Sequence, residues 1–441
     1  MWDFSTDAAF QRKLDWAAAL VRDEIEPLDV LFPGTAEPYD RDSEVFREVI
    51  RPLQRQVRER GLWAAHLPPA LGGTGMGQVK LALLNEILGR SSWAPMVFGT
   101  QAPDSGNAEI LAHYGTDKQR AEYLEPLLDG RIVSTFAMTE PTGGADPGGF
   151  TCRAVRDGDG WVIDGEKWFA SNWSHAAFAV VMAITDPDVP VHQGASMLLV
   201  PAGTPGMEQV RATGLAGEPL GQGAHAYLRF TRCRVPADHL LGEPGAGFRI
   251  AQTRLGGGRL HHAMRSVGQC RRALEMMTER AATRRTRGGP LTDQQSVRHQ
   301  LADTWIQIEQ FRLQVLHAAW QTDRADRTGD RDDARRARLH VSGVKVATPK
   351  VLVDVAYRAL HLHGALGVSN ELPLSRMWQS GPTLAVADGP TEAHQDVVAR
   401  LLLRDAAPAA DPLFGSDHLP TRLAAARAKY ADRLTETGAG R

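Results

Sequence analysis

The stretch Phe136-Ala137-Met138-Thr139-Glu140-Pro141-Thr142-Gly143-Gly144-Ala145-Asp146 is the most informative part of this chain. It is a short apolar run that stops at a Thr-Glu-Pro corner and opens into a glycine-rich loop ending in an acid. Glycines let main chain approach a ligand closely, so such a loop presents N–H groups and a hydroxyl to something flat and polar. Taken alone, an ordinary hairpin explains the stretch as well.

A second motif follows the first at a short distance: Asp164-Gly165-Glu166-Lys167-Trp168-Phe169-Ala170-Ser171-Asn172. It is a turn followed by paired aromatic residues and a hydroxyl. The order and spacing of the two motifs favour a binding surface over two unrelated hairpins.

Composition bounds the class of protein. The 441 residues are too many for one compact core and predict two or three domains. A hydrophobic content of 43% and a net charge of −2 are ordinary for a soluble protein and argue against nucleic-acid or membrane binding. Cys152, Cys233 and Cys270 are scattered without metal-ligand spacing, so we expect reduced, buried thiols and no metal site. With no signal peptide and no apolar run of about 18 residues, the chain is predicted to be cytoplasmic.

The pattern of the sequence divides the chain into four parts. Residues 1–130 read as a helical domain, in which Thr116 and Gln119 have the spacing of a helix capping box. Residues 131–245 carry short β-rich runs and a strong hairpin signal at Asp157-Gly158-Asp159-Gly160, which favour a small antiparallel barrel or sandwich. Residues 246–405 return to long helices, and residues 406–441 form a tail with one possible helix.

Two features of the long helices carry further expectations. An apolar stripe at helical spacing predicts buried positions at Val297, Leu301, Trp305, Ile308, Val315 and Ala319. The charged run from Asp323 to Arg338 is most simply a solvated connection between two helices.

Together these features resemble the acyl-CoA dehydrogenase family. The resemblance covers about residues 40–405 and rests on both loop motifs together with Gly61-Leu62-Trp63, Gly72-Gly73, Gly115-Thr116 with Gln119, and Arg234-Val235-Pro236. It implies a mainly α fold with a central β-domain: an N-terminal helical domain, a small antiparallel β-barrel or sandwich, and a C-terminal four-helix bundle.

The resemblance also implies an activity. Members of the family use FAD to oxidise an acyl-CoA thioester to its 2,3-enoyl form, in fatty acid metabolism. They pass electrons to an electron-transfer flavoprotein or a similar acceptor, and they form homotetramers or homodimers. The chemistry requires a positioned base for a weakly acidic α-proton and donors for the enolate oxygen.

Asp388 is the candidate base. The segment Ala387-Asp388-Gly389-Pro390-Thr391-Glu392 resembles the family's Tyr-Glu-Gly-Thr motif, with Asp where most members have Glu. Its distance from the upstream turn Gly364-Ala365-Leu366-Gly367 fits the family, and Asp-Gly is otherwise a common turn. Some members place the base on the helix near Gly258, where this chain has no carboxylate. The Arg-x-His-His pattern at Arg259-Leu260-His261-His262 and the segment Asp388-Gly389-Pro390 together resemble a subgroup of the family that carries an Asp base.

Matching positions imply the remaining site residues. The FAD contacts expected in this way are Phe136, Met138, Thr139, Phe169, Ser171, Arg284, Gln295, His361, Gly364, Ala365, Pro390 and Glu392. Thr139 and the Met138 backbone would face the pyrimidine edge, Ser171 would offer its hydroxyl to flavin N5, and Phe169 would cover a ring face. Arg284 and Gln295 match positions that reach a neighbouring subunit's FAD, although a basic helix end explains Arg284 equally well.

On the substrate side, the expected contacts are Ala145, Arg259 and Gly389. Ala145 replaces a serine usual in the family, which removes one hydrogen bond to the CoA. Arg259 matches a substrate-side arginine, or it anchors its helix by a salt bridge. The consecutive His261 and His262 cannot share a helix face, so we expect a satisfied structural role for each.

Two other functions remain open at this stage. An oxygen-using flavoenzyme of the same fold, such as a nitroalkane oxidase or a flavin monooxygenase, fits the Asp base and the lost CoA contact at Ala145. A non-catalytic flavoprotein is the weaker alternative, because a carboxylate is present at Asp388.

Overall fold

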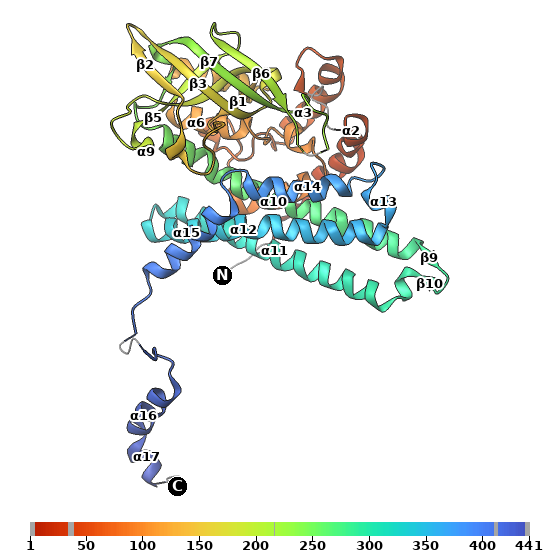
Figure 1. The fold of residues 1–441 in the computed structure, drawn as a ribbon. Helices are drawn as coiled ribbons and strands as arrows, with labels where there is room; N and C mark the ends of the chain where they lie inside the picture. Colours follow the sequence, from red (N-terminus) through yellow and green to blue (C-terminus); the bar gives the residue numbers. More distant parts are fainter. Residues whose placement is uncertain (1–4, 34–38, 216, 410–412, 437–441) are drawn as a thin grey trace. The chain divides into compact units, whose positions relative to one another are not determined.

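The computed structural model describes residues 5–33, 39–215, 217–409 and 413–436. Its contacts group the chain into two compact units, residues 1–395 and 396–441, which are described separately. The first unit follows the predicted order of helices, then strands, then long helices, so the mainly α fold with a central β-region is confirmed (Figure 1).

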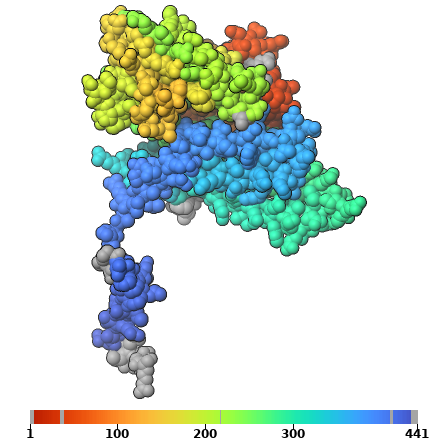
Figure 2. Space-filling model, in the orientation of Figure 1, coloured from red at the N-terminus to blue at the C-terminus, as the bar shows by residue number. Residues whose placement is uncertain are grey.

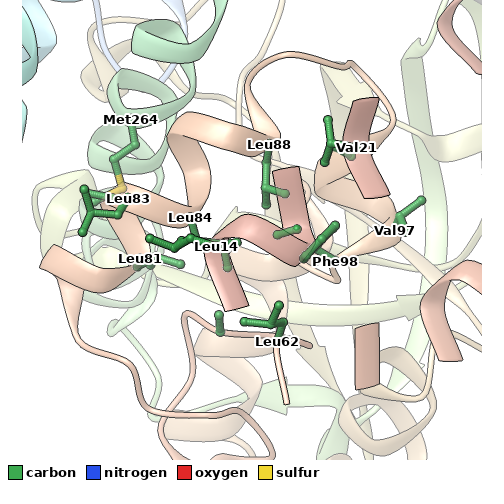
Figure 3. Packing of buried hydrophobic residues seen from close by; sticks show 14 of the residues in the cluster. Leu14, Val21, Leu62, Leu81, Leu83, Leu84, Leu88, Val97, Phe98 and Met264 are labelled. Atoms are coloured by element: carbon green, nitrogen blue, oxygen red, sulfur yellow. The ribbon is translucent and has the colours of Figure 1, made fainter. Parts of the chain in front are cut away.

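Helices form the N-terminal part of the first unit. The α-helices are α1 (Ala8–Leu20), α2 (Glu26–Leu31), α3 (Arg51–Glu59), α4 (Gln78–Leu88), α5 (Ala94–Val97), α6 (Asp104–Tyr114), α7 (Asp117–Gln119) and α8 (Glu125–Leu128). The predicted capping box is present: the Gln119 N–H donates to Thr116 Oγ1, and the Thr116 N–H donates to the Gln119 side chain. The core of this part continues into the long helices, and Figure 3 shows Met264 pointing toward Leu83 of α4.

Eight strands form one sheet. They are β1 (Val133–Ala137), β2 (Arg153–Asp157), β3 (Gly160–Ser171), β4 (Ala176–Ile184), β5 (Ala195–Pro201), β6 (Met207–Thr213), β7 (His225–Pro236) and β8 (Leu240–Leu241). The order is β6-β7-β3-β2-β4-β5-β8, with β1 paired to β4. The predicted hairpin joins β2 to β3, with Asp157 opposite Gly160. The expectation of a wholly antiparallel domain is corrected, because β1 runs parallel to β4.

The centre of the sheet is buried on both faces. In β4, Ala179 and Val181 pack into a core between strands, whereas Phe178 and Val180 face a second core with α6 and α10. A strand buried on both faces is a continuous apolar run rather than an alternating one, as the β4 sequence is. Because β1 pairs with β4, the burial of β4 on both faces places β1 and the loop that follows it beside a tightly packed strand.

Long helices complete the first unit, and the shorter helix α15 continues from it into the second. The long helices are α10 (Gly247–Thr283), α11 (Gln295–Thr328) and α12 (Arg331–His363); shorter ones are α9 (Val191–Gly194), α13 (Ala365–Val368), α14 (Leu374–Val386) and α15 (Thr391–Arg404). A two-stranded turn, β9 (Arg285–Thr286) and β10 (Gly289–Pro290), joins α10 to α11. Residues 331–395, blue in Figure 2, form much of the bundle surface in that view.

Two expectations for the long helices were wrong. Trp305 is 57% exposed, because Thr304 takes the inward position and accepts a hydrogen bond from Arg358 at 3.0 Å. The charged run from Asp323 to Arg338 is helical except for the short turn between α11 and α12. Its Asp323 carboxylate accepts the backbone N–H groups of Gln78 (2.5 Å) and Val79 (3.0 Å), which caps the start of α4.

The second unit contains the end of α15 and two tail helices, α16 (Leu419–Lys429) and α17 (Ala431–Glu436). The single helix expected there is therefore divided near Tyr430. In the part of the chain that the structure describes, no helix combines the length and the apolar character needed to cross a membrane.

Candidate active site

The two loop motifs of the sequence meet at the end of β1. The Trp168 N–H donates to the Thr139 carbonyl at 2.8 Å, and Thr135 Oγ1 donates to the Ser171 carbonyl at 2.6 Å. Each contact joins one motif, or the strand leading into it, to the other. Two segments that are separate in the sequence thus form one surface.

This surface offers aromatic and hydroxyl groups. Phe169 is 44% exposed, has a left-handed backbone (φ +56°) and stacks on Trp168 with ring centroids 5.0 Å apart. A bulky residue with positive φ is an outlier that surrounding structure must hold in place, and such residues cluster at ligand sites. The Ser171 hydroxyl is hydrogen-bonded to His225 Nδ1 at 2.9 Å. Phe136, Met138, Thr139 and Ser171 are all partly buried.

A buried ion pair that the sequence did not reveal supports the surface from beneath. Lys167 Nζ donates to Glu140 Oε1 and to the Met138 carbonyl, both at 2.8 Å, and the two side chains are 0% and 1% exposed. The Glu140 carboxylate also accepts the Thr151 N–H (2.5 Å), the Thr151 hydroxyl (3.0 Å) and the Cys152 N–H (3.1 Å). Glu140 belongs to the first motif and Lys167 to the second. Their opposite charges were the signal in the sequence that could have indicated the ion pair.

Asp388 lies in the short turn between α14 and α15. Both Asp388 (φ +55°) and Gly389 (φ +99°) have left-handed backbone, so the residue predicted to be the base lies in an Asp-Gly turn. Arg259 Nε donates to the Asp388 carbonyl at 3.0 Å, and His394 Nε2 lies 3.3 Å from the same oxygen. Arg259 therefore holds the backbone of this turn through a hydrogen bond to a carbonyl, and within the described residues it makes no salt bridge, which was the alternative to a substrate-side role.

The surroundings of Asp388 are rich in basic groups. Burial lowers the pKa of Lys345 to about 8 and that of His394 to about 4. The negative charge of Asp388 acts in the opposite direction and raises both pKa values. Burial also lowers the pKa of Arg254 and Arg259, against the opposing effect of Asp388. Lys345 Nζ donates to the Leu384 carbonyl at 2.6 Å, near the end of α14. Lys345, His394, Arg254 and Arg259 thus all lie close enough to Asp388 to interact with it electrostatically.

A run of three glycines on α10 leaves bare backbone beside Asp388. A Cβ at Gly258 would lie 3.0 Å from Asp388 Oδ2, and one at Gly257 would lie 3.3 Å from Glu109 Oε2. A Cβ at Gly256 would meet nothing within 4 Å. Burial raises the pKa of Glu109 to about 7. Side chains at the second and third glycines would crowd two carboxyl groups.

Arg254 connects α10 to the first loop motif. Its guanidinium carbon lies 3.9 Å from the centre of the Phe136 ring, and its Nε donates to Asn107 Oδ1 at 3.0 Å. Asn107 in turn donates to the Ser134 hydroxyl at 2.9 Å, which donates to Asp104 at 2.6 Å. This buried network was not found from the sequence, because its members lie on three elements distant in the chain.

Five of the other predicted FAD contacts belong to segments separate from the Asp388 turn. Arg284 and Gln295 are exposed near β9 and β10, and His361, Gly364 and Ala365 are exposed around the start of α13. Helix α14, whose 13 residues make it about 20 Å long, separates the segment around the start of α13 from Asp388. Pro390 and Glu392 follow Asp388 directly, and Ala145 is exposed on the glycine-rich loop. A single chain therefore does not bring all the expected FAD contacts together.

The histidine pair departs from its expected structural role. His261 is buried with Nε2 unpartnered among the described residues, and its ring faces that of His66 with centroids 6.1 Å apart. His262 points elsewhere: its Nε2 lies 3.6 Å from Asp388 Oδ2. The two histidines face different neighbours, as their consecutive positions require.

An exposed aromatic ring beside hydroxyl groups on the sheet, and a carboxylate on the turn between α14 and α15, indicate an enzyme that binds a flat ligand with a polar edge. Family models match this chain in three consecutive segments: "Acyl-CoA dehydrogenase, N-terminal domain" over residues 11–131, "middle domain" over 135–233 and "C-terminal domain" over 245–403. The chain belongs to the acyl-CoA dehydrogenase family.

Individual relatives agree with this assignment. The chain is 40% identical over 364 residues to "Acyl-CoA dehydrogenase family member 11" of Rattus norvegicus, covering 81% of this chain but 45% of that protein. It is 40% identical to "Probable acyl-CoA dehydrogenase FadE2" of Mycobacterium tuberculosis, covering 80% of this chain and 85% of that protein. The solved butyryl-CoA dehydrogenase of Megasphaera elsdenii is similar with a TM-score of 0.75 and 26% identity, over 91% of this chain and all of that one.

Proposed function

We propose that this protein catalyses the FAD-dependent α,β-dehydrogenation of an acyl-CoA thioester to the 2,3-enoyl-CoA, with Asp388 as the base. The observation that carries the proposal is the Asp388 turn: a carboxylate beside bare helix backbone at Gly258, in a surrounding of basic groups. The family membership of the chain supports the reaction class.

The residues of the sheet surface fit a flavin. An exposed aromatic ring at Phe169, held in a strained backbone, and hydroxyls at Thr139 and Ser171 match a ring system with a polar edge. These three residues, with Phe136 and the Met138 backbone, would hold the FAD. When bound, FAD supplies the hydride acceptor for the substrate β-carbon.

Asp388 takes the α-proton from the acyl group. A carboxylate does this efficiently when it stays ionised before the reaction and is held at the right distance. Arg259 and His394 fix the backbone of Asp388 through its carbonyl oxygen, which leaves the side chain to face α10. Asp is one methylene shorter than Glu, and the missing side chain at Gly258 lets α10 approach it.

On the substrate side, the backbone at Asp388 and Gly389 would donate to the thioester oxygen and stabilise the enolate. Arg259 would act by holding that turn. Ala145, exposed on the glycine-rich loop, has no hydroxyl to offer the CoA. The remaining anchoring would come from main-chain groups of the loop.

The partners follow from the same proposal. Arg284, Gln295, His361, Gly364 and Ala365 would contact the FAD of a neighbouring subunit in a homodimer or homotetramer. Exposed apolar side chains on α11 and α12, Trp305, Ile306, Leu313 and Tyr357, support association through these helices. An electron-transfer flavoprotein or a similar carrier would reoxidise the flavin. Analytical ultracentrifugation of the purified protein tests the assembly, and a monomer at micromolar concentration would overturn it.

The activity is tested by mixing the purified, FAD-loaded protein with acyl-CoAs of different chain length without oxygen. Rapid bleaching of the flavin with one chain length supports the proposal, and no bleaching with any thioester overturns it. Asp388→Asn is the matched variant: it should retain FAD and lose the bleaching. Bleaching by nitroalkanes alone, or oxygen uptake without an electron carrier, would favour the oxygen-using alternative.

A further inference from the structure

The carboxylate of Asp388 has one basic neighbour within ion-pair distance. Among the described residues, His262 is the one Lys, Arg or His whose nitrogen lies within 4 Å of an Asp388 carboxyl oxygen, with Nε2 3.6 Å from Oδ2. Within the described part of the chain, no residue donates a hydrogen bond to the Asp388 carboxylate, whereas Arg259 and His394 both bond to the Asp388 carbonyl. The backbone of Asp388 is thus fixed, while its side chain has His262 as its remaining support.

The location of His262 suits such a role. It lies on α10, one turn beyond Gly258, so both positions face the same side of the helix toward Asp388. The two side chains are 30% and 18% exposed, so the contact lies in partly desolvated surroundings, where polar interactions are stronger than in water. A side chain at Gly258 would occupy the space next to Oδ2 and separate the pair.

Other groups around His262 act on its charge. Asp388 on the α14–α15 turn favours the protonated imidazole, whereas Arg254 and Arg265 of α10 and Lys345 of α12 disfavour it. Burial has the largest effect and lowers the pKa of His262 below its usual value. The imidazole is therefore neutral at neutral pH and offers one N–H donor rather than a full charge.

We propose that His262 is a positioning residue for the base: its Nε2–H donates to Asp388 Oδ2 and turns the other oxygen toward the substrate α-carbon. This inference rests on the proposed function of Asp388. A neutral donor suits the task, because it orients the carboxylate without weakening its basicity as much as a cation would. The distance must shorten by less than 1 Å to reach hydrogen-bond length, which is within the adjustment expected when a site binds substrate.

His262→Leu and His262→Gln test the proposal. Leu removes the donor, and Gln supplies a donor near the position of Nε2. In anaerobic rapid mixing with the acyl-CoA that bleaches the parent protein, we expect His262→Leu to reduce its flavin about ten- to a hundredfold more slowly, the loss expected for a hydrogen bond to a charged group. We expect an unchanged dissociation constant for the acyl-CoA and full FAD content, and His262→Gln should restore most of the rate.

His261→Gln is the matched control, since it changes the adjacent histidine, which faces His66 rather than Asp388. It should leave the reduction rate within about twofold of the parent. A His262→Leu rate equal to the parent rate would overturn the inference, as would equal losses in the Leu and Gln variants. If the parent protein itself is not bleached by any acyl-CoA, the proposed function has failed rather than this inference.

Discussion

The buried Lys167–Glu140 pair gives the sharpest test of what shapes the glycine-rich loop. Replacing Lys167 by Met removes the ammonium and leaves the Glu140 carboxylate inside the sheet without its counter-charge. Breaking a buried pair in this way typically costs about 3–5 kcal/mol, because an uncompensated charge remains in the interior. Here Glu140 keeps three donors, from the Thr151 N–H, the Thr151 hydroxyl and the Cys152 N–H. We therefore expect a loss near the lower limit, about 3 kcal/mol.

Urea unfolding of the FAD-loaded protein, followed by circular dichroism, measures this loss. Adding Glu140→Gln to Lys167→Met removes the stranded charge and should recover at least about 1 kcal/mol. Lys118→Met is the matched control, because Lys118 pairs with Asp238 at the surface, where both side chains are about half exposed or more. Exposed pairs contribute about 0–1 kcal/mol, so the control should be nearly neutral. A Lys167→Met loss no larger than that of Lys118→Met would refute the reasoning.

Three further changes have defined outcomes. Gly258→Ala should raise the thermal midpoint of unfolding, since alanine favours a helix over glycine by up to about 1 kcal/mol. It should also slow flavin reduction about tenfold, because the new Cβ displaces Asp388 Oδ2. Faster flavin reduction would contradict the contact between position 258 and Asp388. Asp323→Ala should lower the free energy of unfolding by about 1–2 kcal/mol through loss of the α4 cap, and no loss would show that water replaces it. Burial lowers the pKa of His66 to about 4 from an unfolded value near 6.5, so the unfolded chain binds the extra proton and stability falls as the pH drops from about 6.5 to 4. Thermal scans of His66→Gln over this range should give a shallower fall than the parent, and parallel curves would count against it.

Local signals in the sequence were sufficient for local structure. The capping box at Thr116, the hairpin at Asp157–Gly160 and the turn at Asp388-Gly389 each depend on residues within a few positions of one another. Such features follow from short-range geometry, so their residue types specify them directly. The order of helical and β-rich segments was predictable for the same reason.

Features that depend on a distant partner were not predictable. The apolar stripe of α11 placed Trp305 inside, but Thr304 is the buried residue because Arg358 of α12 supplies its hydrogen bond. Asp323 was predicted to lie in a solvated connection between helices, because no neighbouring residue in the sequence indicates that it caps a helix 245 residues earlier in the chain. A helical stripe leaves neighbouring positions nearly equivalent, and the tertiary partner decides between them.

Two side-chain pairs of the site, Glu140–Lys167 and His262–Asp388, show how this limit bears on function. Glu140 and Lys167 were both visible inside the motifs, as were His262 and Asp388, but each was interpreted within its own segment. Because a charge buried in a rigid layer needs an opposite charge, the Thr-Glu-Pro corner and the Glu-Lys-Trp turn had to meet. The loop's shape then depends on Glu140 at its base, whereas Ala145 is exposed near its far end. Under the proposed function, the absence of a serine hydroxyl at Ala145 would therefore remove one contact to the CoA and leave the backbone around Thr139 in place.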